Sequence, residues 1–435
     1  MRAGDTIVAL SSGAVPAGVA VIRLSGPLAR RSIERFAGSL PVPRRLTLAA
    51  IKTEGQVLDH GLIVWFPGPH SFTGEDCAEL QVHGSPAVVR ALLRALTAQE
   101  GVRLAEAGEF TRRAFENGRL DLTEVEGLGD LIAAETENQR RQAVARLDGA
   151  LSRQLESWRL RLLDTRAEIE ARLDFSDEGD VDTELPPSVG ETIDELLLEM
   201  TRALADLSHG RIVREGLRVA LAGLPNAGKS SLLNALAKSD LAIVSDEPGT
   251  TRDVREVAID LGGQLVILVD MAGLRETESQ AEAEGVRRAK AEIGQADLVL
   301  WLMAADGENT PPAVETTAPV WMVRTKSDLG VSNGSAALDI SVKTGDGLHA
   351  LLGQLTKFAE TANGRGEPAL LDRERDREAV AAAIGALRDA RASLRQMELA
   401  AEALRRAGDA LARLLGRMDT EMVLDRLFAA FCIGK

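Results

Sequence analysis

The sequence predicts a multidomain protein that combines α/β and all-α parts, with a doubly wound parallel sheet inserted into a helical domain. The 435 residues suggest about three domains at ~150 residues each. Strand-like and helical patterns alternate from Leu217 to about Ala359, which is typical of a doubly wound sheet. Helical stretches poor in glycine lie on both sides of this region. An insertion whose two helical flanks pack together is therefore the most economical architecture.

The first part of the chain, residues 1–118, has the pattern of a mixed α/β domain. Apolar spacing predicts helices at Leu28–Phe36 and Pro86–Leu96. Runs of β-favouring residues between turn residues predict strands at Thr6–Leu10, Gly18–Leu24, Leu46–Ile51, Leu62–Phe66 and Ala78–His83.

The helical domain is predicted in two parts, residues 119–210 and 362–435, around an inserted domain at residues 211–361. From Leu122 to about Phe175, Ala, Leu, Glu and Arg dominate, and a second helix is expected at about Val189–Leu207. The tail from about Asp372 is helical again. An amphipathic stripe with three- and four-residue steps consists of Leu147, Leu151, Leu155 and Trp158.

Composition narrows the class of protein. Apolar residues make up 45% and charged residues 27%, as in soluble globular proteins, and no apolar run is long enough for a membrane span. The strand-like beginning does not resemble a secretory signal, and two cysteines, Cys77 and Cys432, fit a reducing cytoplasmic location. The net charge of −15 argues against a general polyanion binder, although a local basic patch could still contact RNA.

A phosphate-binding loop is the strongest motif. Residues Gly223–Ser230 read GLPNAGKS and fit G-x-x-x-x-G-K-[ST], between an apolar strand at Leu217–Ala222 and a helix at Ser231–Ala237. Backbone N–H groups of such a loop hold phosphates, Lys229 should reach the β- and γ-phosphates, and Ser230 should bind Mg²⁺.

Later segments favour GTP over ATP. Asp270 closes a strand and can hold Mg²⁺ through water, while Thr251 can complete the Mg²⁺ shell. Asp328 follows the predicted strand Val320–Arg324. Its carboxylate can accept hydrogen bonds from both the N1–H and the 2-amino group of guanine, and adenine does not have these two donors. The expected GTP contacts are Asn226, Ala227, Gly228, Lys229, Ser230, Ser231, Ser245, Asp246, Glu247, Pro248, Gly249, Thr250, Thr251, Asp270, Met271, Ala272, Gly273, Thr325, Lys326, Ser327, Asp328, Ser341, Val342 and Lys343.

Two positions depart from the usual pattern of GTPases. Thr325 stands where Asn commonly begins the base-reading element, and Met271 stands where Thr is common. Asn contacts the base and ties adjacent loops together. Thr is shorter and cannot repeat every bond, so we expect the GTP preference to persist through Asp328 with lower affinity.

Further motifs carry a family resemblance over almost the whole chain. Asp246–Asp253, together with Pro225 and Asn226, resembles bacterial GTPases in which a monovalent cation assists hydrolysis. The ending FCIGK at Phe431–Lys435 is the most specific signature. Together with Ser71–Asp76, Glu79–Gly84, Gly108–Phe115 and Asn117–Leu122, it resembles the MnmE (TrmE) family of tRNA uridine modification GTPases.

The resemblance implies a function that composition and spacing do not. It implies an N-terminal α/β folate-binding and dimerisation domain, and a P-loop GTPase domain inserted into the helical domain of a homodimer. It implies a flavoprotein partner, MnmG (GidA), which carries FAD, in a heterotetramer-type complex that acts on tRNA. The pair would add an aminomethyl-type group, such as carboxymethylaminomethyl, to C5 of the wobble uridine. A tetrahydrofolate derivative of the 5-formyl or methylene type would supply the carbon, and K⁺ would replace an arginine finger.

Residue roles follow from the same resemblance. Glu282 matches the glutamate that orients the attacking water. The K⁺ site would consist of Asn226, Ser245, Glu247 and Thr250. The folate site would be lined by Arg23, Glu79, Arg119 and Lys435, with Arg119 in place of the more common Lys, which keeps the charge but not the shape.

Alternatives stay open at several of these residues. Asn226 either senses K⁺ or bonds its own loop backbone, and Glu282 is either catalytic or part of a solvated acidic helix start. Cys432 is either a nucleophile or a packing residue that shapes the pocket, and Cys77 is read as structural. The second functional hypothesis is a regulatory or ribosome-assembly GTPase that binds ribosomal RNA without chemistry on it. Five arginines could either contact tRNA or lie on a solvated helix face: Arg140, Arg141, Arg153, Arg159 and Arg161.

Overall fold

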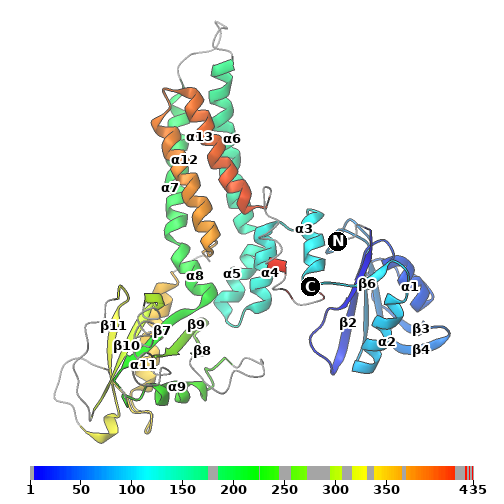
Figure 1. The fold of residues 1–435 in the computed structure, drawn as a ribbon, viewed down its shortest axis with the longest axis horizontal. Coiled ribbons are helices and arrows are strands. Elements are labelled where there is room, and N and C mark those ends of the chain that lie inside the picture. The colour runs from blue at the N-terminus through cyan, green and yellow to red at the C-terminus, as the bar shows by residue number, and fades with distance from the viewer. Residues whose placement is uncertain are drawn as a thin grey trace, which may run out of the picture. The chain divides into compact units, whose positions relative to one another are not determined.

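The computed structural model describes residues 4–174, 185–224, 226–243, 256–271, 294–305, 316–330, 338–364, 369–416, 427, 428, 431 and 434. The chain divides into two compact units. The first comprises Met1–Gly129 and Leu411–Lys435, and the second comprises Asp130–Ala410 (Figure 1). Among the described residues, no helix combines the length and apolarity needed to cross a membrane.

The first unit contains a mixed sheet with helices on one face. Its strands are β1 (Thr6–Leu10), β2 (Ala17–Ser25), β3 (Thr47–Thr53), β4 (Gln56–Phe66), β5 (Cys77–Gly84) and β6 (Val102–Leu104), in the order β3-β4-β5-β2-β1-β6. Helices α1 (Ala29–Ala37) and α2 (Pro86–Thr97) pack on the side chains that alternate inward, such as Ile22 and Leu80. The predicted strands and helices of this part are present within two residues at each end, except that β4 begins at Gln56, six residues before the predicted Leu62.

The opposite face of this sheet is only partly covered. Helix α3 (Glu109–Glu116) places Phe110 against Ile7 and Ala9 of β1. Farther along the same face, Leu48 of β3 and Leu62 of β4 are paired across the strands, and Leu48 is 73% exposed. Arg23 and Glu79 are also paired, on β2 and β5.

The helical part consists of α4 (Leu122–Ala133), α5 (Glu137–Leu147), α6 (Ala150–Asp174), α7 (Pro187–Ala205), α8 (Leu207–Glu215), α12 (Glu374–Ala392) and α13 (Met397–Leu414). The predicted stripe is divided between two helices, because Gly149, at a φ of +76°, separates α5 from α6. Leu147 therefore ends α5, while Leu151, Leu155 and Trp158 form the buried face of α6. Helix α12 packs beside α7, so the helices before and after the inserted sheet do lie together (Figure 1).

The inserted region forms the predicted doubly wound sheet. Its elements are β7 (Leu217–Gly223), α9 (Lys229–Ala237), β8 (Glu256–Leu261), β9 (Gln264–Asp270), β10 (Leu298–Ala304), β11 (Val320–Thr325), the 3₁₀ turn Ser327–Leu329, β12 (Leu338–Asp339) and α11 (Leu348–Ala362). The strand order is β12-β11-β10-β7-β9-β8, and only β8 pairs antiparallel. Because parallel strands end at one edge, Gly223, Asp270 and Thr325 come to the same edge of the sheet.

Candidate functional site

The phosphate-binding loop joins the end of β7 to the start of α9. Gly223 has a φ of +145°, and a Cβ there would lie 2.3 Å from the carbonyl oxygen of Leu302, so only glycine fits. Asn226 and Gly228 also have positive φ values, +64° and +88°. The N–H groups at the start of α9 therefore face a tight loop, which is the arrangement that binds phosphate.

Lys229 lies inside this loop and is 7% exposed. Its Nζ donates to the carbonyl oxygens of Gly223, at 2.7 Å, and Leu224, at 3.0 Å. Burial lowers the pKa of Lys229, and the nearby negative charge of Asp270 opposes that shift. The ammonium group is thus held at the position from which it can bind a phosphate oxygen.

Ser230 and Asp270 are brought together from two different elements. The Ser230 Oγ donates to Asp270 Oδ2 at 2.7 Å, joining the first turn of α9 to the end of β9. A hydroxyl and a carboxylate are oxygen ligands of the kind that Mg²⁺ prefers. The chemistry of this pair therefore fits a Mg²⁺ ion.

Thr325 contacts the phosphate loop, which the sequence reasoning did not anticipate. Its Oγ1 donates to the carbonyl oxygen of Ala227 at 2.7 Å, and Met303 O is a second acceptor at 3.4 Å. The side chain is too short to repeat every bond of an asparagine, but it does tie the end of β11 to the loop. The loop-tying part of that role is therefore present here.

Asp328 is oriented by a side chain from the next segment. The Ser341 Oγ donates to Asp328 Oδ1 at 2.8 Å, and the Ser327 N–H donates to Ile340 O. The Ser341 N–H donates to Asp346 O, so it is the hydroxyl of Ser341 that contacts the Asp328 carboxylate. The sequence placed Ser341 at the site but missed the role of its hydroxyl.

A second polar cluster lies in the N-terminal unit. Arg23 donates from Nε and Nη2 to Glu79 Oε1, at 3.0 and 2.9 Å. The Arg23 guanidinium also lies 5.6 Å from the ring centre of Phe72 and 5.9 Å from that of Phe110. Two of the predicted folate-site residues are thus adjacent, because they are paired across β2 and β5.

Arg113, which the sequence analysis did not single out, forms ion pairs with two further carboxylates of this unit. It pairs with Glu75 at 2.9 Å and with Glu109 at 3.1 Å. Burial of Glu109 opposes ionisation, but hydrogen bonds from Arg103, the Glu106 N–H and Arg113 hold the pKa of Glu109 below its ordinary value. Glu75 lies within the motif Ser71–Asp76, and Glu109 and Arg113 lie within the motif Gly108–Phe115, so these motifs were the available signal.

The loop that contains Phe72 also lies beside Arg119. A Cβ at Gly74 would lie 3.3 Å from Arg119 Cγ, and Asn117 Nδ2 donates to Thr73 O at 2.7 Å. The same loop therefore contacts Arg23 through Phe72 and lies against Arg119 at Gly74.

The C-terminal end of the chain reaches the same unit. The Ser11 Oγ donates to Gly434 O at 2.6 Å, and a Cβ at Gly434 would lie 2.1 Å from Leu10 O. Ahead of it, Phe428 and Phe431 pack with Val125. Gly434 thus contacts the end of β1, the strand that pairs with β2 next to Arg23.

Several predicted site residues lie outside the described part of the chain. They are Ser245, Asp246, Glu247, Pro248, Gly249, Thr250, Thr251, Ala272, Gly273, Glu282, Cys432 and Lys435.

Comparison with known proteins gives consistent matches. Residues 122–432 match the family model of the MnmE helical domain, and residues 6–119 match that of the GTP-binding protein TrmE N-terminus. A protein named tRNA modification GTPase MnmE from Azorhizobium caulinodans is 51% identical, over 100% of both chains. One of the same name from Methylorubrum populi is 52% identical, over 99% of this chain and 98% of its own. Among solved structures, the G domain of the T. maritima FeoB iron transporter is 27% identical over 33% of this chain and 99% of its own, with a TM-score of 0.26.

Proposed function

Since the chain belongs to the MnmE (TrmE) family of tRNA modification GTPases, we propose that it couples GTP hydrolysis to the modification of the wobble uridine in certain tRNAs. The product carries an aminomethyl-type group, such as carboxymethylaminomethyl, at C5. The protein acts as a homodimer with the flavoprotein MnmG (GidA), which supplies FAD, in a heterotetramer-type complex. The observation that carries the GTPase part is the meeting of Lys229, Ser230, Asp270 and Asp328 at one sheet edge.

The nucleotide is held by residues of three strand ends. The phosphates lie on the N–H groups of the loop and the start of α9, and Lys229 turns from its carbonyl partners to the β- and γ-phosphates. Ser230 and Thr251 bind Mg²⁺, with Asp270 acting through water. Mg²⁺, when bound, neutralises charge on the β- and γ-phosphate oxygens. Asp328 accepts the guanine N1–H and 2-amino group.

Hydrolysis itself is assigned to groups near the γ-phosphate. Asn226, Ser245, Glu247 and Thr250 form a K⁺ site, and Glu282 orients the attacking water. Asn226 supports this assignment because it lies in the loop between Gly223 and Lys229, where its backbone is left-handed. A cation at this position supplies positive charge that an arginine finger provides in other GTPases.

The one-carbon chemistry is assigned to the N-terminal unit. Glu79 accepts hydrogen bonds from the amide-like edge of the pterin ring, while Arg23, Arg119 and Lys435 pair with polar and carboxylate groups of the folate. The Arg23–Glu79 pair supports this proposal because it joins two of the assigned residues. The Ser11–Gly434 contact supports it because it brings the two ends of the chain into one unit. Cys432, two residues before Gly434, would then lie close to the one-carbon unit.

The partly covered sheet face of the first unit supports the proposed homodimer. Leu48 and Leu62 are exposed apolar side chains on the face that also carries Arg23 and Glu79. Pairing of two such faces would remove these side chains from water, which favours association.

Reconstitution of the reaction tests the proposal. The purified protein, MnmG, undermodified tRNA, GTP, a methylene- or formyl-tetrahydrofolate and an amine, either ammonium or glycine, which supplies the nitrogen of the added group, are combined. The modified uridine is measured by mass spectrometry. We expect product only when GTP and folate are both present. GTP hydrolysis without any tRNA product, together with co-purification of ribosomal subunits, would instead support the ribosome-assembly alternative.

Removal of the residues Cys432–Lys435 tests the folate site separately. We expect loss of tRNA modification and weaker folate binding with unchanged GTP hydrolysis, and Cys432→Ser should keep folate binding but lose modification if the thiol is a nucleophile. Normal modification by the truncated protein would remove the folate assignment and leave the GTPase assignment in place.

A further inference from the structure

The chain passes twice between the helical part and the inserted sheet, and both passages lie against α5. The first passage is α8, which leads into β7, and the second is residues 369–373, which lead into α12. The Gln142 Nε2 donates to Gly210 O of the first passage at 3.2 Å and to Ala369 O of the second at 2.8 Å. A Cβ at Gly210 would lie 2.2 Å from Leu371 O, so the two passages also touch each other directly.

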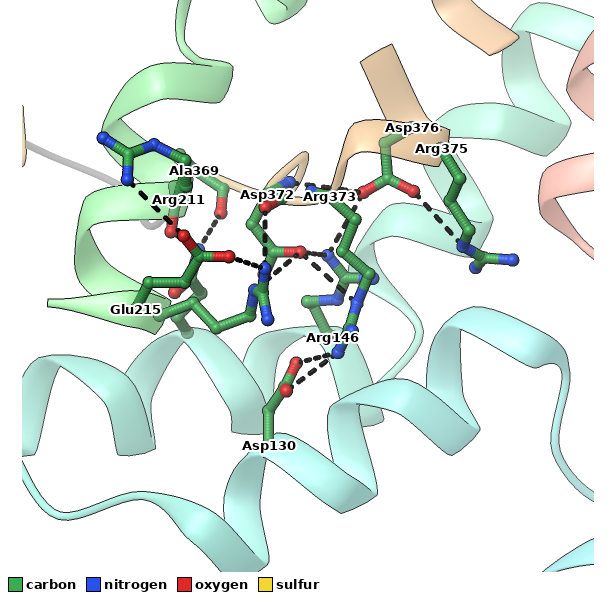
Figure 2. A network of polar contacts seen from close by, with 12 residues as sticks. Asp130, Arg146, Arg211, Glu215, Ala369, Asp372, Arg373, Arg375 and Asp376 are labelled. Atoms are coloured by element: carbon green, nitrogen blue, oxygen red, sulfur yellow. Dashed lines mark hydrogen bonds and ion pairs between the residues drawn. The ribbon is translucent and has the colours of Figure 1, made fainter. Parts of the chain in front are cut away.

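Arg146, one turn farther along α5, fixes the second passage more strongly. Its side chain is fully buried, and its Nη1 donates to Leu370 O at 2.8 Å and to Asp372 Oδ1 at 2.6 Å (Figure 2). Asp376 Oδ2 lies 3.5 Å from the same nitrogen and accepts the N–H groups of Asp372 and Arg373. The beginning of α12 is therefore held in a single position relative to α5.

The N-terminal end of α5 contacts a third segment of the inserted sheet. The Asn138 N–H donates to Gly263 O, in the turn between β8 and β9, at 3.2 Å. Next to it, the Gln139 Nε2 donates to Arg214 O at 3.0 Å, at the end of α8. Strand β9 runs from this turn to Asp270 at the nucleotide edge, a distance of roughly 20 Å for its seven residues.

The two ends of the β8–β9 hairpin thus have different neighbours. One end meets α5, and the other end carries Asp270 at the nucleotide edge. A shift of this hairpin with the bound nucleotide would change its contact with α5. Since α5 holds both passages, such a shift would also act on the position of the inserted domain.

We propose that Gln142 and Arg146 are positioning residues that join both passages to α5, and that through the β8–β9 turn they couple the bound nucleotide to the helical part. Coupling of this kind is reciprocal, so weakening the joint must also change how the protein distinguishes GTP from GDP. Neither residue lies at the nucleotide edge, and a purely structural role would not alter that ratio.

Gln142→Met tests the joint with little risk to folding, because it removes two hydrogen bonds and leaves no buried charge. Arg146→Lys, which keeps the charge but not the forked geometry, is the second variant. Arg391→Gln is the matched control, since Arg391 forms an exposed pair with Asp194 between α12 and α7, away from both passages. Hydrogen exchange of residues 138–146 and 369–376 is compared with GDP and with a non-hydrolysable GTP analogue, and both affinities are measured.

In the unaltered protein we expect exchange in these segments to differ at least about twofold between the two nucleotides. Gln142→Met should remove the difference and change the GTP-to-GDP affinity ratio by about fivefold or more, which lies in the usual range of coupling between sites. Arg146→Lys should act in the same direction, and Arg391→Gln should match the unaltered protein. Equal exchange with both nucleotides in the unaltered protein would overturn the proposal, and so would a ratio in Gln142→Met within twofold of the control.

Discussion

Replacement of Thr325 by Val removes one hydroxyl and keeps the shape of the side chain. That hydroxyl is buried and donates to Ala227 O at 2.7 Å. In the valine variant, the Ala227 carbonyl loses its donor at a position closed to water. A buried acceptor left without a partner costs about 1–3 kcal/mol. Because Ala227 directly precedes Gly228 and Lys229, we expect much of this cost to appear in the conformation of the phosphate loop.

The expected result is weaker nucleotide binding. A loss of about 1–2 kcal/mol corresponds to a ~5- to 30-fold rise in the dissociation constant. Thr325→Ser keeps the hydroxyl and should bind nearly as the unaltered protein does. Thr325→Asn should bind more tightly, because an amide can reach both Ala227 O and the guanine ring.

Titration with a fluorescent GDP analogue measures these affinities, and the urea midpoint of unfolding reports whether the fold is intact. Inosine nucleotide, which lacks the 2-amino group, serves as competitor for base selectivity. Selectivity should be unchanged in Thr325→Val and reduced in Asp328→Asn, since an amide cannot accept from both guanine donors. If Thr325→Val binds GDP within twofold of the unaltered protein at an unchanged urea midpoint, the role of the hydroxyl in holding the loop is wrong.

Three further predictions concern cation use, catalysis and pH. GTP hydrolysis should be faster in K⁺ than in Na⁺, and Asn226→Ala should remove that difference; equal rates in both salts would count against the cation site. Glu282→Ala should lower kcat by about 10²-fold or more with nearly unchanged GTP affinity, measured by single-turnover hydrolysis; weakened binding at unchanged kcat would indicate a structural residue. Burial raises the pKa of Asp372 from 3.8 to about 7, although the Arg146 guanidinium opposes the rise. The folded state then holds a proton that the unfolded state releases, so stability should fall as pH rises from about 4 to 7, by up to about 4 kcal/mol at 1.36 kcal/mol per pH unit. Asp372→Asn should flatten that part of the urea-midpoint profile, and an unaltered profile in this variant would assign the pH dependence elsewhere.

The nucleotide edge was largely predictable because its signals are local. The spacing of the phosphate loop, the strand before it and the helix after it all lie within a short stretch, and parallel strands place Asp270 and Asp328 at the same edge. The family resemblance assigned Arg23 and Glu79 to one site, but it did not predict their hydrogen bond, which follows from the strand register. The division of the helical stripe at Gly149 was missed because the apolar spacing continues across the two-residue break between α5 and α6.

Other features depend on contacts between residues far apart in the chain. Thr325 and Ala227 are separated by 98 positions, so propensity and spacing carry no information about their hydrogen bond. Gln142 and Ala369 are separated by 227 positions. Gln142 and Arg146 looked like ordinary polar positions of an amphipathic helix, and only the packed structure shows that they face the two passages of the chain.

The buried charged side chains at the two passages are better explained by the chain path that they fix than by a contribution to the stability of the fold. Arg146 and Asp376 are fully buried. Removing such groups from water costs several kcal/mol for each ion, and well-packed apolar side chains of similar volume often serve stability equally well. Apolar packing, however, has no direction, whereas the bonds from Arg146 to Leu370 O and Asp372 fix the path of the chain at the point where the inserted domain ends. A domain attached through two passages can rotate freely on them unless they are held. Directional bonds at the passages remove that free rotation, so a shift of the β8–β9 hairpin is passed on to the helices as proposed above.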